Sequence, residues 1–172
     1  MKWYAIRVTY GRELKFQTVL NERGWETFIP MIVTKVEKNG RREKVTVPAV
    51  SNLCFVRAEQ DELYSFFKSL GEACPARFIW DKASREAIVV PEKAMNDFIT
   101  VSRAMYEDTV YLTELSSKLR EGQKVRVIEG PFAGVEGRVV RIKKSRRILV
   151  ELPGMLSVAA TFIPSDNLEQ IV

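Results

Sequence analysis

The sequence predicts a mixed α+β domain followed by a small all-β domain. Apolar patterns of period 2 and period 3.6 alternate as far as about residue 103, whereas only β signals run from Lys124 onward. The clearest β signal lies between Gly122 and Ile142, where glycines at 122, 130, 134 and 137 punctuate two alternating apolar runs. Mixed elements followed by strands alone indicate two small domains in a chain of 172 residues.

The first third of the chain predicts a strand, a helix and a hairpin. Phe16, Val19 and Leu20 stand at helical spacing ahead of Gly24, which suits a helix C-terminus. Asn39-Gly40 is the strongest short hairpin signal, and β-rich runs flank it. The expected elements are a strand over 2–9, a helix over 13–23, and strands over 27–36 and 43–47.

The middle of the chain predicts two more helices. Leu63, Phe66, Phe67 and Leu70 share one helical face behind two acidic residues, and the helix should end at Gly71. Pro91 suits a first helical position ahead of a face containing Ala94, Met95, Phe98 and Ile99. The remaining expected elements are strands or extended segments over 53–56, 76–80 and 87–90.

Composition narrows the classes of function. The chain has no histidine, so the commonest general base and metal ligand are missing, and enzyme chemistry and a metal or other cofactor are not expected. Cys54 and Cys74 fit no redox or metal spacing and are expected to be buried free thiols. No apolar run approaches a membrane span, and Met1 leads directly into a strand pattern, so we expect a cytoplasmic protein without a membrane partner.

The basic charge permits an anionic partner. Net charge is +5, and residues 1–105 carry 17 basic against 13 acidic side chains, leaving +1 for the rest. Five basic residues surround the Asn39-Gly40 turn, and a second basic run separates two β segments at 143–147. Both are by default solvated turns, with nucleic-acid or polymerase contact as the alternative. The first group is Lys35, Lys38, Arg41, Arg42 and Lys44.

Motif order adds a family resemblance. The segment 122–142 looks like a KOW motif. The order of four earlier segments resembles that of the NusG family of transcription elongation factors. These segments are Trp3-Tyr4-Ala5-Ile6, Phe28-Ile29-Pro30-Met31, the basic hairpin and Leu53-Cys54-Phe55-Val56. Three segments are similar to the UpxY type, which are antiterminators of capsular polysaccharide operons. These segments are Tyr10-Gly11-Arg12-Glu13-Leu14-Lys15, Glu37-Lys38-Asn39-Gly40 and Val47-Pro48-Ala49-Val50-Ser51-Asn52-Leu53.

The resemblance implies an architecture and a partner. It implies an N-terminal antiparallel sheet flanked by helices over 1–105, a linker over 106–118 and a five-stranded SH3-like barrel over 119–172. Family members bind the clamp helices of RNA polymerase through an apolar depression and suppress pausing, which requires no enzymatic step. A monomer is expected.

The resemblance places the polymerase contact at four residues. Leu53 and Phe55 match the strand at the depression, with Val50 beside them and Arg7 on the first strand. Strand alternation places Leu53 and Phe55 on one face and Cys54 and Val56 on the other, so ordinary core packing is the alternative for either pair. Asn52 replaces the usual glycine, which asparagine tolerates because it adopts the left-handed region readily.

Other contacts are expected from the same resemblance. Arg12, Lys15 and Arg77 are candidates for contact with non-template DNA, or with nascent RNA, against the alternative of solvated surface charge. Phe132 is either an exposed handle for a partner of the barrel or a plug at its end. Family barrels recruit a ribosomal protein or a termination factor, but Glu151-Leu152-Pro153-Gly154 replaces the usual contact loop.

Two other functions remain alternatives at this stage. The basic charge and the KOW segment also suit an RNA-binding or ribosome-associated protein. An enzyme acting on a nucleic-acid or polysaccharide precursor is weakly supported, because no phosphate-binding glycine loop, nucleophile elbow or carboxylate pair is present.

Overall fold

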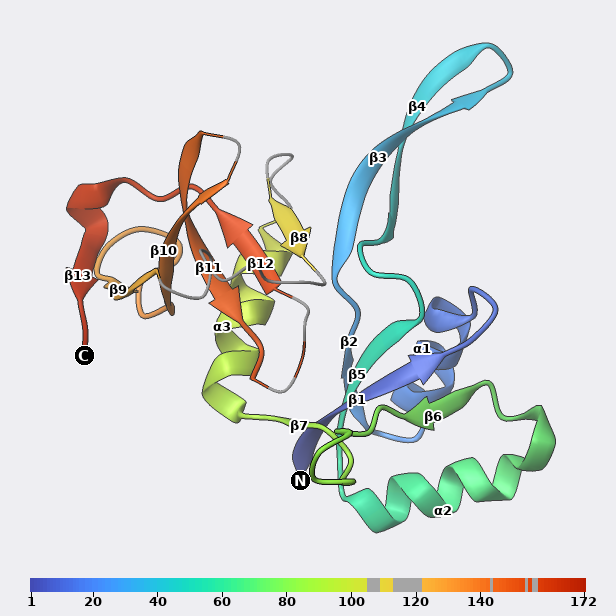
Figure 1. Cartoon of the computed structure of the whole chain (residues 1–172). Helices are drawn as coiled ribbons and strands as arrows, with labels where there is room; N and C mark the ends of the chain where they lie inside the picture. Colours follow the sequence, from blue (N-terminus) through green and yellow to red (C-terminus); the bar gives the residue numbers. More distant parts are fainter. Residues whose placement is uncertain (105–108, 113–121, 143, 154, 156–157) are drawn as a thin grey trace. The chain divides into compact units, whose positions relative to one another are not determined.

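The structure is a computed structural model of the chain, and it describes residues 1–104, 109–112, 122–142, 144–153, 155 and 158–172. These residues form two compact units (Figure 1). The first comprises Met1–Pro30 and Pro48–Glu92, and the second comprises Met31–Val47 and Lys93–Val172.

An antiparallel sheet of five strands forms the centre of the first unit. The strand order is β2-β5-β1-β6, and β7 also pairs with β1. The central strand β1 is buried at four consecutive positions, from Trp3 to Ile6, and its neighbour β5 is buried at almost every position. The bounds are β1 (Lys2–Val8), β2 (Glu26–Phe28), β5 (Leu53–Ala58), β6 (Ala76–Phe78) and β7 (Val89–Val90).

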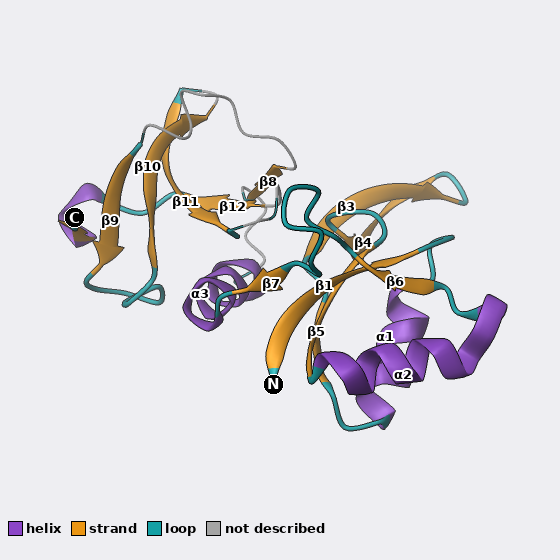
Figure 2. Ribbon diagram, turned by 60° about the horizontal axis from the view of Figure 1, so that its bottom comes forward, coloured by secondary structure: helices purple, strands orange, loops and turns teal. Residues whose placement is uncertain are grey.

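Helices α1 (Glu13–Glu22) and α2 (Gln60–Leu70) cover one face of this sheet (Figure 2). The ring of Phe78 from β6 lies 5.6 Å from Tyr4 of β1 and 5.5 Å from Phe67 of α2, so strand and helix rings pack together. Phe16 of α1 extends the cluster to α2. A short 3₁₀ turn, η1 (Gly71–Ala73), follows α2. The predicted helical faces are buried for the most part, but Val19 of α1 and Leu70 at the end of α2 are exposed.

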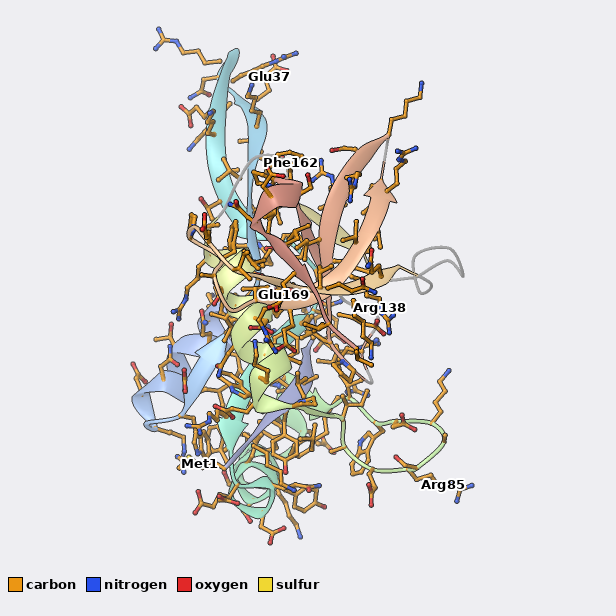
Figure 3. All side chains as sticks on the ribbon, turned by 90° about the vertical axis from the view of Figure 1, so that its left-hand side faces the viewer. Met1, Glu37, Arg85, Arg138, Phe162 and Glu169 are labelled. Atoms are coloured by element: carbon orange, nitrogen blue, oxygen red, sulfur yellow. The ribbon has the colours of Figure 1, made fainter. Side chains whose placement is uncertain are left out.

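Strands β3 (Met31–Lys38) and β4 (Arg41–Pro48) form a two-stranded hairpin. The backbone φ angles of Asn39 and Gly40 are 52° and 73°, and two consecutive positive values suit a tight turn whose twist matches the strands. The predicted Asn-Gly hairpin is confirmed. Figure 3 shows Glu37 near its tip, with side chains extending outward from both strands.

A six-stranded antiparallel sheet, here called the C-terminal sheet, dominates the second unit. Its order is β13-β9-β10-β11-β12-β8, with helix α3 (Glu92–Arg103) in the same unit. Its strands are β8 (Val110–Leu112), β9 (Gln123–Val127), β10 (Glu136–Ile142), β11 (Ser145–Glu151), β12 (Val158–Thr161) and β13 (Leu168–Gln170), with η2 (Ser165–Asn167) before the last.

Two glycines of the KOW-like segment allow close backbone packing in this sheet. A Cβ at Gly137 would lie 2.5 Å from the Leu149 carbonyl oxygen, and one at Gly122 would lie 2.5 Å from that of Val139. Real Cβ atoms do not approach so closely, so a larger residue would displace backbone. Glycine is thus needed at these two positions because the neighbouring backbone leaves no room for a side chain, and not because the chain turns there.

Helix α3 is hydrogen-bonded to the C-terminal sheet. The Asp97 carboxylate accepts bonds from Lys93 Nζ at 2.6 and 2.7 Å and from the Glu136 amide at 3.2 Å, and it is nearly buried. Lys93 also donates to the Gly134 carbonyl at 2.8 Å. The Phe98 ring meets Tyr111 edge-on at 6.2 Å. Burial raises the pKa of Tyr111.

The predicted fold class is confirmed: antiparallel sheets and helices precede a β-rich C-terminal region. The predicted boundaries 1–105, 106–118 and 119–172 stay a prediction. The compact units divide the chain in another way, since the second unit contains Met31–Val47 as well as Lys93–Val172. Val110–Leu112, which lies within the predicted linker, forms strand β8 and pairs with β12. Within the described part of the chain, no helix has the length and apolarity needed to cross a membrane.

Candidate functional site

The sheet of the first unit has a second face, opposite α1 and α2, and this face holds the residues predicted to contact a partner. Arg7 pairs with Leu53 across the sheet, and Ala5 pairs with Phe55. Residues directly opposite in an antiparallel pair project to the same side. Arg7, Leu53 and Phe55 therefore share one face, as alternation predicted.

Burial separates the four predicted polymerase contacts. Leu53 is 3% exposed and Phe55 is fully buried, so neither ring nor isobutyl group offers a surface here. Burial of this degree fits the core-packing alternative, and contact of these two residues with polymerase stays a prediction. Arg7 is exposed and Val50 is half-buried. Alternation could identify the shared face, but not the degree of burial of each side chain on it.

Hydrogen bonds of Asn52 hold the turn before β5 in place. Glu13, buried in the first turn of α1, accepts a bond from the Asn52 amide at 2.6 Å. The Asn52 carbonyl in turn accepts from the Val8 amide at 3.0 Å. Asn52 has φ of 62°, which confirms that asparagine supplies the left-handed backbone expected of the usual glycine. The start of β5 is fixed to both β1 and α1.

Arg7 and Arg77 form a pair of like charges. They lie directly opposite each other on β1 and β6, and both side chains are exposed. Like charges at such positions are destabilising, because the Cβ atoms are only about 5 Å apart. Among the described residues, neither arginine forms an ion pair with a carboxylate. The pair therefore leaves two guanidinium groups exposed without a carboxylate partner among the described residues.

The loop between β1 and α1 presents an aromatic ring that was not among the contact residues predicted from the sequence. Tyr10 is 86% exposed, and its φ of 61° is unusual for a residue with a bulky side chain. The Arg12 guanidinium carbon lies 5.7 Å from the centre of that ring. Thr9 binds the Pro75 carbonyl, so this loop adjoins the strand that carries Arg77. In the sequence, the only indication of an exposed ring in this loop was that the bulky Tyr10 directly precedes the glycine Gly11.

The other sequence candidates fall into different environments. Lys15 is exposed on α1, where it can contact a partner or solvent. Phe132 is 6% exposed, which fits the plug alternative and not the exposed handle. The basic hairpin residues Lys35, Lys38, Arg41 and Arg42 are all exposed. Cys54 is a buried free thiol, as expected, whereas Cys74 is only partly buried.

No described cluster of His, Cys, Asp or Glu has the composition to hold a metal ion. The thiol of Cys54, on β5 of the first unit's sheet, has a strongly shifted pKa. Burial is the larger cause and the charge of Glu13 the smaller, and together they raise the pKa to about 12. A thiol with so high a pKa stays protonated and is a poor nucleophile. The chemistry that this surface supports is binding by guanidinium and aromatic groups.

Together the fold and this surface define a two-part binding protein with an α+β sheet domain and a KOW region. Residues 1–99 match the family described as "Transcription termination factor nusG", and residues 121–151 match the KOW motif. The chain belongs to the NusG family. Membership makes it a transcription elongation or antitermination factor in general, and it points to RNA polymerase as the partner.

A solved structure with similarity to this chain is that of NusG from Thermotoga maritima, described under "Domain interaction in Thermotoga maritima NusG". It has 17% sequence identity and a TM-score of 0.46, and the match covers 99% of this chain and 97% of that one. No curated protein matches the chain in the corresponding sequence search.

Proposed function

We propose that this chain is a specialised antitermination factor that binds RNA polymerase and promotes processive transcription of particular operons. The motifs around Tyr10, Glu37 and Val47 support operons for capsular or surface polysaccharide, because they resemble the UpxY type. The observation that carries the binding role is the exposed Arg7 and Arg77 pair. Like charges retained side by side without a carboxylate favour an external anionic partner.

The polymerase contact is proposed at the face of the first sheet that carries Arg7. Arg7 and Val50 supply the accessible groups, and the clamp helices are the expected partner. Leu53 and Phe55 lie on the same face as Arg7. Their direct contact with polymerase stays a prediction, and it requires that these two buried side chains become accessible to the partner.

Nucleic acid is proposed to meet the edge formed by the β1–α1 loop and β6. Arg12, Lys15 and Arg77 supply cations there, and Tyr10 adds an exposed ring on which an unpaired base can stack. Non-template DNA is the expected strand. Salt-dependent affinity would follow, because phosphate contacts release counterions.

The C-terminal sheet is proposed to connect the complex to a second protein, either a ribosomal protein or another factor. Phe132 is buried, and its contact with that second protein stays a prediction. The protein is proposed to act as a monomer and without a cofactor.

The test reconstitutes elongation complexes with purified polymerase on a scaffold that has an extended non-template strand. The full-length protein should shorten pauses and remain bound. Arg7→Gln/Arg77→Gln should weaken binding by about tenfold, whereas Lys68→Gln/Lys82→Gln removes two exposed charges from the same unit and should change it less than twofold. Equal effects of the two double variants, or no binding by the native protein, would overturn the proposal.

Operon specificity needs a separate measurement in cells. Nascent transcripts that copurify with the protein should be enriched in a few polysaccharide operons. Uniform occupancy across transcription units would instead indicate a general elongation factor.

A further inference from the structure

The C-terminal sheet contains a pocket of about 300 Å³ that the proposed polymerase contact does not use. Val139 and Ile148, directly opposite each other on β10 and β11, line it together with Leu168 of β13. The segment after β12 supplies another wall, which includes Phe162 and Asp166. The volume is large enough for one flat ring the size of a nucleobase.

One rim of the pocket is strongly basic. Arg146 lines the pocket and pairs directly with Arg141 across the β10–β11 hairpin, and Lys144 lies in the turn between them. All three are exposed. Alternation places Arg141 and Arg146 on the same side as Val139 and Ile148, so the two charges stand beside the apolar floor.

These arginines differ from others in the same sheet. Arg126 binds Glu136 at 2.8 Å, and Arg138, labelled in Figure 3, lies 3.9 Å from Glu151. Neither Arg141 nor Arg146 forms an ion pair with another described residue. Their direct opposition therefore adds repulsion that no ion pair among the described residues relieves, and an anion bound between them would relieve it.

The wall of the pocket carries an exposed aromatic ring. Phe162, labelled in Figure 3, lies in the segment after β12 and is 54% exposed. An accessible ring next to guanidinium groups suits a planar, anionic ligand, because bases stack on aromatic faces while phosphates bind arginine. Asp166 on the same wall can accept hydrogen bonds from amino groups on a base edge. A purely acidic peptide would gain nothing from that carboxylate.

We propose that this pocket binds single-stranded nucleic acid, with a base against Phe162 and the adjoining phosphates on Arg141 and Arg146. The site lies in the second unit and does not depend on the Arg7 surface. It gives the protein a nucleic-acid contact of its own, apart from the polymerase.

The test measures fluorescence anisotropy of labelled twelve-nucleotide oligo(rC), oligo(rU) and oligo(dT) with the full-length protein. Arg141→Gln/Arg146→Gln should weaken binding about tenfold and reduce the slope of log affinity against log salt by about 1.4, the value for two single-strand phosphate contacts. Lys68→Gln/Lys124→Gln removes the same net charge elsewhere and should have less than a twofold effect. Equal losses in both double variants would show diffuse attraction and overturn the site.

Phe162→Leu separates stacking from charge, because it keeps an apolar side chain but removes the ring. It should weaken binding at least fivefold and leave the salt slope unchanged. An unchanged affinity would overturn the base pocket, and unfolding curves would confirm that the variant is folded. An unlabelled polyglutamate peptide should compete poorly; competition as effective as that of the oligonucleotide would identify a protein ligand instead. Comparison of oligo(rU) with oligo(dT) decides between RNA and DNA.

Discussion

At the scale of single residues, burial decides which side chains can act on a partner. Phe55 and Cys54 are adjacent and face opposite sides of the sheet, yet both are fully buried. Their roles in the free protein are therefore packing and exclusion of water. The accessible chemistry comes from Arg7 on the central strand β1, Arg77 on β6 and Tyr10 in the loop after β1.

Phe55→Ala should lower the free energy of unfolding by about 3–5 kcal/mol, because it removes a fully buried ring from β5. Urea unfolding measures the loss. Tyr64→Ala is the matched control, since Tyr64 lies on α2 and is 55% exposed; it should cost less than about 0.5 kcal/mol. Unchanged stability together with lost polymerase binding would contradict the core role.

The thiol of Cys54 should make stability fall in alkaline solution. Its folded pKa is about 12 against 9.0 for a free thiol, so between these values the unfolded state holds fewer protons than the folded state. The free energy of unfolding therefore declines as pH rises through this window. Urea unfolding at pH 8 and pH 10.5 should show a smaller decline in Cys54→Ala than in the native protein, and Cys74→Ala should behave like the native protein.

Sequence reasoning located residues by pattern but could not rank their exposure. Asn52 and Asn39 were predictable because asparagine is favoured where φ is positive. Tyr10 was not, because a bulky residue rarely adopts that conformation and only the surrounding loop imposes it. Leu53 and Phe55 were assigned to the correct shared face, yet alternation does not report how far a face is covered. Arg7 and Arg77 came together only through the pairing of β1 with β6, which no local pattern encodes.

At the scale of elements, strand pairing creates the features that matter. Pairing of β1 with β6 opposes Arg7 to Arg77, and pairing of β10 with β11 opposes Arg141 to Arg146. Strand β8 was missed because three residues between polar segments carry too short a pattern for alternation to register. Its partner β12 is what defines it as a strand.

Arg77→Gln should raise the free energy of unfolding by about 0.2–1 kcal/mol, because it removes repulsion from Arg7 on the neighbouring strand. The same change should weaken polymerase binding. Thermal and urea unfolding at low salt measure the gain, and it should shrink as salt screens the pair. A loss of stability would show that the guanidinium has a structural role instead.

Gly137→Ala should destabilise the C-terminal sheet by about 1–3 kcal/mol, because the new methyl would lie 2.5 Å from the Leu149 carbonyl oxygen. Differential scanning calorimetry of the full chain measures the effect. Ala133→Ser changes an exposed turn residue in the same segment and serves as the control. A tolerated alanine would mean that the strands can separate locally without cost.

At the scale of the whole molecule, the charge is modest but locally concentrated. A net charge of +5 would not by itself require a polyanionic partner. The two opposed arginine pairs and the exposed basic hairpin gather that charge at a few places, each in an element that projects it outward. The positions of the basic side chains, more than the total charge, support the proposal that the protein binds a complex of protein and nucleic acid.

Binding of the full chain to a nucleic-acid scaffold should therefore weaken steeply between 50 and 200 mM salt. Combining Arg12→Gln/Arg77→Gln with Arg141→Gln/Arg146→Gln should flatten the salt dependence by the sum of the two separate reductions, because the two sites belong to different compact units. Anisotropy titrations at four salt concentrations measure the slopes. A combined reduction no larger than either single one would show that one site accounts for all the binding.

The backbone at Tyr10 affects how variants of this protein would be selected. A tyrosine at φ of 61° is strained, whereas glycine adopts that conformation freely. A screen that rewards heat resistance alone would therefore enrich Tyr10→Gly, while a screen that rewards growth dependent on the target operon would retain the aromatic ring. Opposite enrichment at one position under the two screens would separate what this loop contributes to folding from what it contributes to transcription.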